Sequence, residues 1–196
     1  MTKHVSKKSI LQLIKDDHKL LRESIVVLTS EETVLSEKKR QLERFIFNIK
    51  VHAKAEETSL YNSLIELQDI RPDILEGFEE HNMADHLMME LDAKNFQSDW
   101  SDEIDAKAKV LAEIIEHHVK DEETELFPKI KSYLTKTELE NLGVIYLQTR
   151  KDLRRELESR FTLPSLKTAS WVVQEGFKGT FERVSSFVSS KFSASR

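Results

Sequence analysis

A ten-residue phrase rich in histidine and glutamate occurs twice in the chain. The first copy runs from His52 to Tyr61 and the second from His118 to Phe127, and both read His-x-x-x-Glu-Glu-Thr-x-Leu-aromatic. In an α-helix, residues four apart are rotated by about 40° and separated by about 6 Å along the axis, so they share one face. The histidine and the first glutamate of each copy can therefore hold a common metal ion. The repeat points to metal chemistry.

Each copy is preceded by a lone histidine that directly follows an acidic residue. His18 precedes His52 by 34 residues, and His81 precedes His118 by 37 residues. All four segments carry apolar residues at helical spacing, and the histidines and first glutamates fall within these apolar stripes. The candidate metal ligands are His18, His52, Glu56, His81, His118 and Glu122.

Inward-facing polar side chains are costly unless something compensates them. Burying an imidazole without a hydrogen bond costs a few kcal/mol, and an isolated carboxylate costs more. Bound cations neutralise the carboxylates and coordinate the ring nitrogens, whereas a metal-free structural bundle leaves the four polar stripes unexplained. The chain has no cysteine, which excludes thiolate zinc sites, iron–sulfur clusters and disulfides. Iron, manganese and zinc all accept the remaining ligand types.

The elements that must position these ligands are helices. Glycine and proline are scarce, at 4 and 3 residues, and alternating apolar runs are lacking. We expect an all-α fold, an antiparallel up-down four-helix bundle with additional C-terminal helices. The predicted helices run from Ser6 or Ser9 to Leu28, from a cap at Ser36 to about Leu67, from about Pro72 to Lys94, from a cap at Ser101 to Lys131, and from Thr135 to about Arg160. We expect residues 1–134 to form the metal-binding bundle and residues 135–196 to form a C-terminal helical extension with an amphipathic tail.

The composition changes from Phe161 onward. The last 36 residues hold five of the ten phenylalanines, and five basic against two acidic side chains give them a net charge of +3. Apolar residues from Val173 to Phe192 recur at helical spacing. Docking onto the bundle, self-association with a second copy, contact with a membrane surface, disorder and an unknown partner all remain open for this tail.

Charge and hydropathy restrict the partners of the protein. The net charge of −5 is mixed in sign along the chain, which argues against a general nucleic-acid surface. No run of about 18 apolar residues is present to form a transmembrane segment, and the first nine residues lack the apolar core of a signal peptide. We expect a cytoplasmic protein.

With these residues in place, the sequence resembles hemerythrin-like proteins, which contain an HHE cation-binding domain. The resemblance covers about residues 10–131 and rests on the order His, then His-x-x-x-Glu, in duplicate. It implies a four-helix bundle that holds a non-haem di-iron centre with an oxo or hydroxo bridge, with manganese or zinc as less favoured occupants. By resemblance, Glu56 and Glu122 bridge the two irons, and the four histidines are terminal ligands.

The third helix departs from the pattern of the oxygen carriers in this family, which have a further histidine four residues after the one at His81. Asp85 occupies that position here, and His86 follows it. Asp85 is in phase with the inward stripe and is interpreted as a seventh ligand, a hydrogen-bond partner of a ligand, or a spectator near an opening. His86 needs a local bulge to reach the metal. Tyr61 either packs in the core or hydrogen-bonds a bound oxygen ligand.

The second glutamate of each phrase has a different expected role from the first. Glu57 and Glu123 are predicted to be solvated or to accept a hydrogen bond from a ligand histidine. His117, which precedes a ligand, lies off the stripe and is expected on the surface.

Two functions follow from these observations. The first is redox chemistry on a small diatomic or peroxide ligand (O2, NO or H2O2), in stress response or iron-centre repair, because the departure at Asp85 disfavours reversible oxygen carriage. The alternative is an iron- or oxygen-sensing or binding module without turnover. Whether the protein is an enzyme stays open from the sequence.

Overall fold

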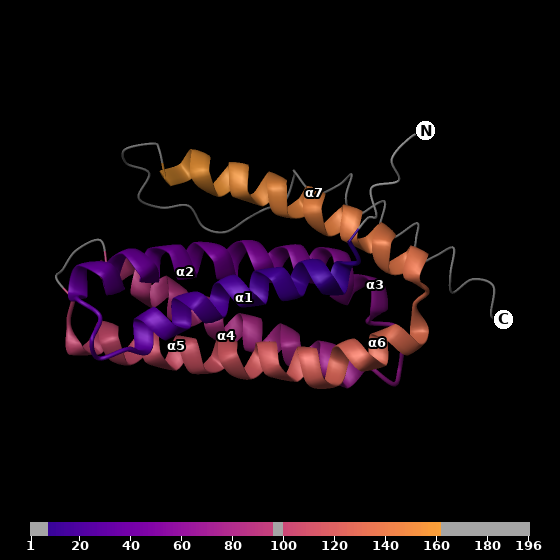
Figure 1. Ribbon diagram of the computed structural model, residues 1–196, viewed down its shortest axis with the longest axis horizontal. Coiled ribbons are helices and arrows are strands. Elements are labelled where there is room, and N and C mark those ends of the chain that lie inside the picture. The colour runs from indigo at the N-terminus through magenta and orange to yellow at the C-terminus, as the bar shows by residue number, and fades with distance from the viewer. Residues whose placement is uncertain (1–7, 96–99, 162–196) are drawn as a thin grey trace.

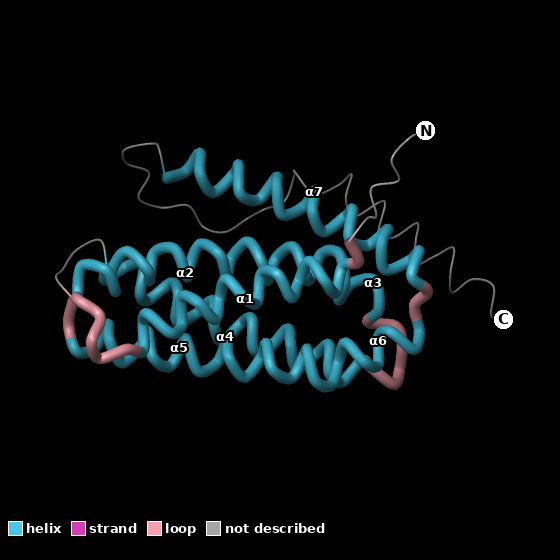
Figure 2. Tube along the Cα trace, in the orientation of Figure 1, coloured by secondary structure: helices cyan, strands magenta, loops and turns pink. Residues whose placement is uncertain are grey.

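The computed structural model describes residues 8–95 and 100–161, which fold into helices joined by short turns, with no strand among them (Figures 1 and 2). Four helices lie alongside one another and enclose a common interior. They are α1 (Ile10–Thr29), α2 (Leu35–Glu56), α4 (Arg71–Asn95) and α5 (Asp102–Asp121). The predicted all-α four-helix bundle is confirmed. Among the described residues, no helix has the length and apolar character required to cross a membrane.

Serine side chains mark two of the helix starts. The Ser9 hydroxyl accepts a hydrogen bond from the backbone N–H of Gln12 at the start of α1, and the Ser101 hydroxyl accepts one from the N–H of Ile104 at the start of α5. Each bond satisfies an N–H group that has no partner inside the helix. The cap at Ser101 agrees with the prediction, and Ser9 is one of the two predicted starts of the first helix.

The predicted cap at Ser36 is wrong. Helix α2 begins at Leu35, and Val34 occupies the cap position without a side-chain hydrogen bond. Three residues into the helix, Lys38 is buried and its ammonium group lies 3.2 Å from an Asp105 carboxylate on α5. We attribute the earlier start to this contact, which ties the first turn of α2 to the bundle.

Two wide π-helical turns interrupt the ligand-bearing helices, where the sequence predicts regular α-helix. The first turn, η1 (Glu57–Tyr61), is followed by α3 (Asn62–Leu64), and the second, η2 (Glu122–Leu126), is followed by α6 (Phe127–Tyr133). A π turn holds one extra residue, so a position five residues on returns to the same face. Tyr61 therefore comes into phase with Glu56, and Phe127 with Glu122, and both aromatic rings are buried. The irregular turns add a ring to each ligand-bearing face.

The apolar core is divided into two clusters, with the polar side chains of the repeated phrases between them. One cluster includes Ile14, Leu60, Ile74, Phe127 and Ile130, and the other includes Leu28, Leu42, Met88, Leu91 and Leu111. Fully burying an aliphatic side chain of this size stabilises the fold by about 1.5–3 kcal/mol. Each bundle helix is thus held by apolar packing on both sides of its histidine.

Helix α7 (Lys136–Phe161) runs along α1 and α2, outside the four-helix bundle (Figure 1). Thr135 and Glu138 form a capping box at its start, in which a Glu138 carboxylate oxygen accepts a hydrogen bond from the Thr135 N–H at 2.8 Å. A Cβ added at Gly143 would lie 2.7 Å from the Lys8 carbonyl oxygen, so only glycine permits this approach of α7 to α1. The division at residues 134 and 135 stays a prediction, and the amphipathic tail lies outside the described residues beyond Phe161.

Candidate metal centre

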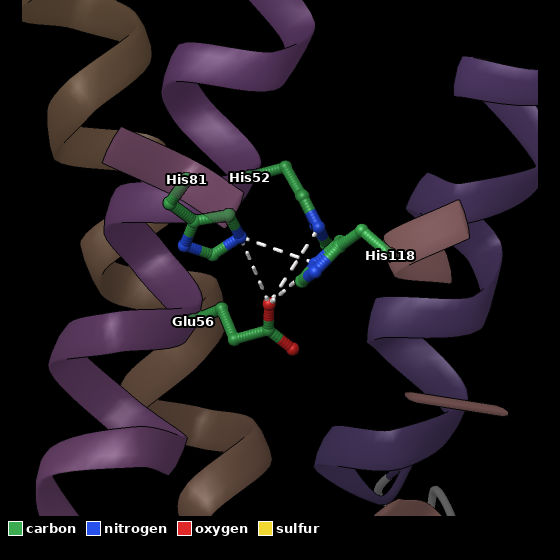
Figure 3. A group of neighbouring side chains, drawn as sticks. All are labelled: His52, Glu56, His81 and His118. Atoms are coloured by element: carbon green, nitrogen blue, oxygen red, sulfur yellow. Dashed lines mark hydrogen bonds and ion pairs between the residues drawn. The ribbon is translucent and has the colours of Figure 1, made fainter. Parts of the chain in front are cut away.

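The six predicted ligands converge in the middle of the bundle, and Figure 3 shows four of them. They are His18 from α1, His52 and Glu56 from α2, His81 from α4, His118 from α5, and Glu122 from the first position of η2. All six are buried, and the most exposed retains 5% of its accessible surface. That they bind metal stays a prediction, but their convergence makes a metal centre possible in geometric terms.

One donor group surrounds the carboxylate of Glu56. Its Oε2 atom lies 3.6 Å from Nε2 of His52, 3.8 Å from Nε2 of His81 and 3.9 Å from Nε2 of His118 (Figure 3). Two donor atoms that each bind one ion at about 2.1 Å are about 4 Å apart when they lie on opposite sides of the ion, and closer in any other arrangement. These spacings suit a single cation among the four side chains.

A second donor group surrounds the carboxylate of Glu122. Its Oε2 atom lies 3.2 Å from Nε2 of His18 and 3.7 Å from Nε2 of His118. His52 belongs to this group as well as to the first, since its ligand atom lies within 4.8 Å of the others. The two groups therefore share His52, and His118 lies close to both carboxylates, so they form one continuous set of nitrogen and oxygen donors.

The inward-facing atoms of this set lack hydrogen bonds. Buried atoms of this kind are expected at a site that binds metal ions. Among the described residues, five such buried atoms make no hydrogen bond, although some face each other as ion pairs, such as His18 and Glu122 at 3.2 Å. They are Nε2 of His18, Nε2 of His52, both carboxylate oxygens of Glu56, and Oε2 of Glu122. Leaving a buried polar group unsatisfied costs about 1–3 kcal/mol, and more if it is charged. In addition, Nε2 of His81 and Nε2 of His118 face each other at 3.2 Å. Cations would satisfy all of these atoms, so the donor set fits them.

The second glutamates of the two phrases hold the outer nitrogens of two histidines. Nδ1 of His18 lies 2.8 Å from a Glu123 carboxylate oxygen, and Nδ1 of His81 lies 3.2 Å from a Glu57 carboxylate oxygen. Of the two predicted roles for these glutamates, the structure shows the hydrogen bond to a ring. A carboxylate at Nδ1 favours the proton on that nitrogen and leaves Nε2 free to coordinate a cation.

Glu80, the acid that precedes His81, supports His118 in the same way. One of its carboxylate oxygens lies 2.8 Å from Nδ1 of His118, and the other lies 3.0 Å from Nδ1 of His117. His117 is exposed, as expected. The sequence pairs this acid with the neighbouring histidine, whereas the fold places it against a histidine on another helix.

The fourth histidine, His52, is supported from α7. The buried hydroxyl of Tyr146 donates a hydrogen bond to Oδ2 of Asp17 at 2.6 Å, and its oxygen lies 3.4 Å from Nδ1 of His52. Arg150, one turn further along α7, lies 2.6 Å from the other oxygen of Asp17. The sequence predicts a helix around Tyr146 but no contact between it and the centre. The acid before His18 was the one local signal for this network.

The ligands share protons in the metal-free protein. Burial and the charge of Glu122 raise the pKa of Glu56 to about 8. Burial disfavours the charged form of His118, but the carboxylates of Glu122 and Glu56 outweigh it and raise its pKa to about 10. Burial also acts against ionisation of Glu122, yet the charges of His118 and His18 hold its pKa below the usual value. A cation must therefore displace protons to bind.

Tyr61 is buried beside the centre and belongs to its hydrogen-bond network. Its hydroxyl donates to Oε1 of Glu122 at 2.6 Å. Gly77 on α4 leaves room for this hydroxyl, since an added Cβ would overlap it. Tyr61 thus fixes the orientation of one predicted bridging carboxylate.

Asp85 and His86 are exposed and belong to neither donor group. The prediction that Asp85 lies on the inward stripe is wrong, because the buried face of α4 continues from His81 through Ala84 and Met88. Steps of three then four residues and of four then three both follow a helical stripe, so the spacing alone does not choose between Ala84 and Asp85. Of the three predicted roles of Asp85, a position near an opening agrees with the structure, since Asp85 lines a cavity of about 490 Å³ that also contacts His81 and extends to Leu157 on α7.

Comparisons with known proteins support the same conclusion from the sequence side. A family model for the hemerythrin HHE cation binding domain matches residues 9–130, well over half of the chain. Comparison with curated proteins and with solved structures gives no match. The matched region includes all six converging side chains and ends before α7. The chain therefore belongs to the hemerythrin family, as a protein with an HHE cation-binding domain.

Proposed function

We propose that the protein binds two iron ions and that this non-haem di-iron centre takes up a small diatomic or peroxide ligand, O2, NO or H2O2. The observation that carries the proposal is the pair of donor groups that share His52. In this arrangement, Glu56 and Glu122 are the bridging carboxylates and the four histidines complete the two ligand sets. Family membership favours iron over manganese and zinc, which accept the same donors.

A bound iron pair supplies Lewis acidity and redox chemistry, with coordination positions that six side chains leave open. The protein orients the ligand side chains and keeps water out of the centre. Glu57, Glu80 and Glu123 keep three imidazoles in the tautomer that can coordinate. The apolar clusters on both sides exclude water, and the cavity beside His81 gives a small ligand access to the centre.

The biological role belongs to the same proposal. The position at which oxygen carriers of the family have an additional histidine is occupied by Asp85, which is exposed. A centre with fewer protein ligands favours reactivity with nitric oxide or peroxide over reversible oxygen carriage. We therefore propose a part in stress response or iron-centre repair, in the cytoplasm.

A second candidate is an iron- or oxygen-sensing module without turnover. The observation that favours it is the contact between His52 and Tyr146, because Tyr146 lies on the helix that leads into the tail. Any shift of His52 on ligand binding would act on α7. Residues 162–196 would then transmit the state of the centre through self-association or membrane-surface contact.

Metal analysis with optical spectroscopy tests the proposal directly. Purified protein should contain two irons per chain, one for each donor group, and show near-ultraviolet oxo–iron charge-transfer bands. Zinc alone at full occupancy would contradict both candidates. Exposure of the reduced protein to nitric oxide, oxygen or peroxide then separates them, since repeated turnover indicates chemistry and one-to-one binding indicates sensing.

A further inference from the structure

A second, narrow opening reaches the centre at a different place from the cavity beside His81, and its lining is more acidic. It lies between α4 and η2 and has a volume of about 40 Å³. We propose that this opening is the route by which divalent cations reach the centre. The inference rests on the proposed function only in requiring that the centre binds metal.

The wall of the opening is strongly acidic. Among the described residues that line it there are six carboxylates and neither lysine nor arginine. The carboxylates are Asp73, Glu76, Glu80, Asp121, Glu122 and Glu125. A space of a few tens of Å³ accommodates a water molecule or a partly dehydrated ion and excludes an organic molecule. The opening thus selects by size and by charge.

Glu122, a predicted metal ligand, lies at the inner end of the opening. Glu122 is 4% exposed, and its Oε2 atom makes no hydrogen bond among the described residues but faces Nε2 of His18 at 3.2 Å. His118, which belongs to the first donor group, lines the same opening. A cation that passes the outer carboxylates therefore arrives at a buried carboxylate of the centre.

Positive groups near the opening offset only part of its charge. Lys129 pairs with Asp73 at 2.7 Å, and His118, which lines the opening and is protonated in the metal-free protein, lies 2.8 Å from Glu80. These two cationic groups stand against six carboxylates, so the opening stays negative. Glu76 and Glu125 are exposed at the outer side. Carboxylates that line a cleft with low-dielectric walls raise the local concentration of cations and their association rate by about 10- to 1,000-fold.

Tyr61 and Gly77 shape the inner part of the route. Tyr61 lines the opening, and its hydroxyl donates a hydrogen bond to Oε1 of Glu122 at the inner end. Any side chain at position 77 would displace that hydroxyl. The larger cavity beside His81 is different, since Lys50 and Lys54 line it together with acids. Cations thus approach the centre through the acidic opening, and small ligands approach it through the cavity beside His81.

The test is the rate of metal uptake by the full-length protein after chelation. Fe(II) is mixed with metal-free protein under anaerobic conditions, and the change in absorbance or fluorescence is followed by stopped flow. In the double variant Glu76→Gln/Glu125→Gln we expect uptake to be roughly three- to tenfold slower at low salt, with unchanged final iron content. At about 1 M salt the difference should vanish, because the Debye length falls from about 10 Å at 0.1 M to about 3 Å.

The matched control is Glu43→Gln/Glu113→Gln, which removes the same charge from exposed positions of α2 and α5. Equal slowing in this control, or an unchanged rate in the test variant, would overturn the proposed route. Loss of final iron content in the test variant would also overturn it, since the two residues would then be ligands. Mn(II) serves as a second probe: a wild-type protein that takes up Mn(II) but no iron would contradict the di-iron function, while the same comparison of rates would still decide the route.

Discussion

Replacement of Tyr146 by phenylalanine tests whether α7 is part of the metal centre. The substitution keeps the buried ring and removes only the hydroxyl, which donates to Asp17 and lies 3.4 Å from Nδ1 of His52. Arg150 still pairs with Asp17 at 2.6 Å, so the carboxylate keeps one partner. In this variant, Nδ1 of His52 loses the one hydrogen-bond partner that it has among the described residues, whereas the other three histidines keep theirs.

The expected magnitudes follow from these contacts. A hydrogen bond to a charged acceptor contributes about 1.5–3 kcal/mol, so the metal-free variant should lose about 2 kcal/mol of its free energy of unfolding. Removing a hydrogen-bond partner of a ligand histidine lowers metal affinity by about 10- to 100-fold. Since the Tyr146–His52 distance of 3.4 Å is longer than the 2.8 Å of His18 and His118 to their carboxylates, we expect the lower limit, about tenfold.

Competition with a chelator gives the iron affinity, and denaturant unfolding of the metal-free protein gives the stability. Tyr133→Phe is the matched control, because the Tyr133 hydroxyl donates to exposed Asp69 on the surface. This control should leave affinity and optical spectrum unchanged. If Tyr146→Phe kept wild-type affinity and wild-type charge-transfer bands, His52 would not depend on α7, and the sensing candidate would lose its structural basis.

Further predictions concern the ligands themselves. In the metal-free protein at pH 7, His118 with a pKa of about 10 and Glu56 with a pKa of about 8 carry protons, so metal binding should release them. Affinity should therefore rise by about tenfold per pH unit for each displaced proton, up to pH 8 for Glu56 and pH 10 for His118, as measured by calorimetry in buffers of different protonation enthalpy. Glu122→Gln should reduce iron to one equivalent or less by elemental analysis, and retention of two would contradict its bridging role. Chelation should lower the melting temperature, since a ligand present at 1,000 times its Kd stabilises the fold by about 4 kcal/mol. Glu57→Gln should weaken iron binding about 10- to 100-fold without loss of secondary structure by circular dichroism, and an unchanged affinity would remove its role at His81.

Much of the centre could be predicted from the sequence, because its main rules are local. The four-residue spacing of His52 and Glu56, and of His118 and Glu122, fixes a shared helix face. The cost of burying these groups then indicates a compensating ion. The same periodicity places His18 on an inward face of α1, and its burial confirms that placement.

The remaining features depend on packing between distant segments. Tyr146 reaches His52 across 94 residues, and no local pattern encodes that contact. The π turns shift the phase of Tyr61 by one residue, which a strictly four-residue stripe overlooks. The predicted orientation of Asp85 is wrong for a related reason, since the buried face of α4 passes through Ala84. The differences at Tyr61 and Asp85 are shifts of one residue on a helix, about 100° of rotation, which apolar spacing does not resolve.

The division of the apolar interior into two clusters has a consequence for how the protein melts. Helices α1, α2 and α4 contribute to both clusters, and α5, which packs in one of them, is connected to the other through η2 and α6. Among the described residues, the buried polar ligands lie between the two clusters. Without ions, little apolar contact connects the two halves, so each half should open as a partly independent unit on heating. Ions bound by these ligands would join the halves mechanically, and calorimetry should then show two overlapping transitions merging into one as the protein is loaded.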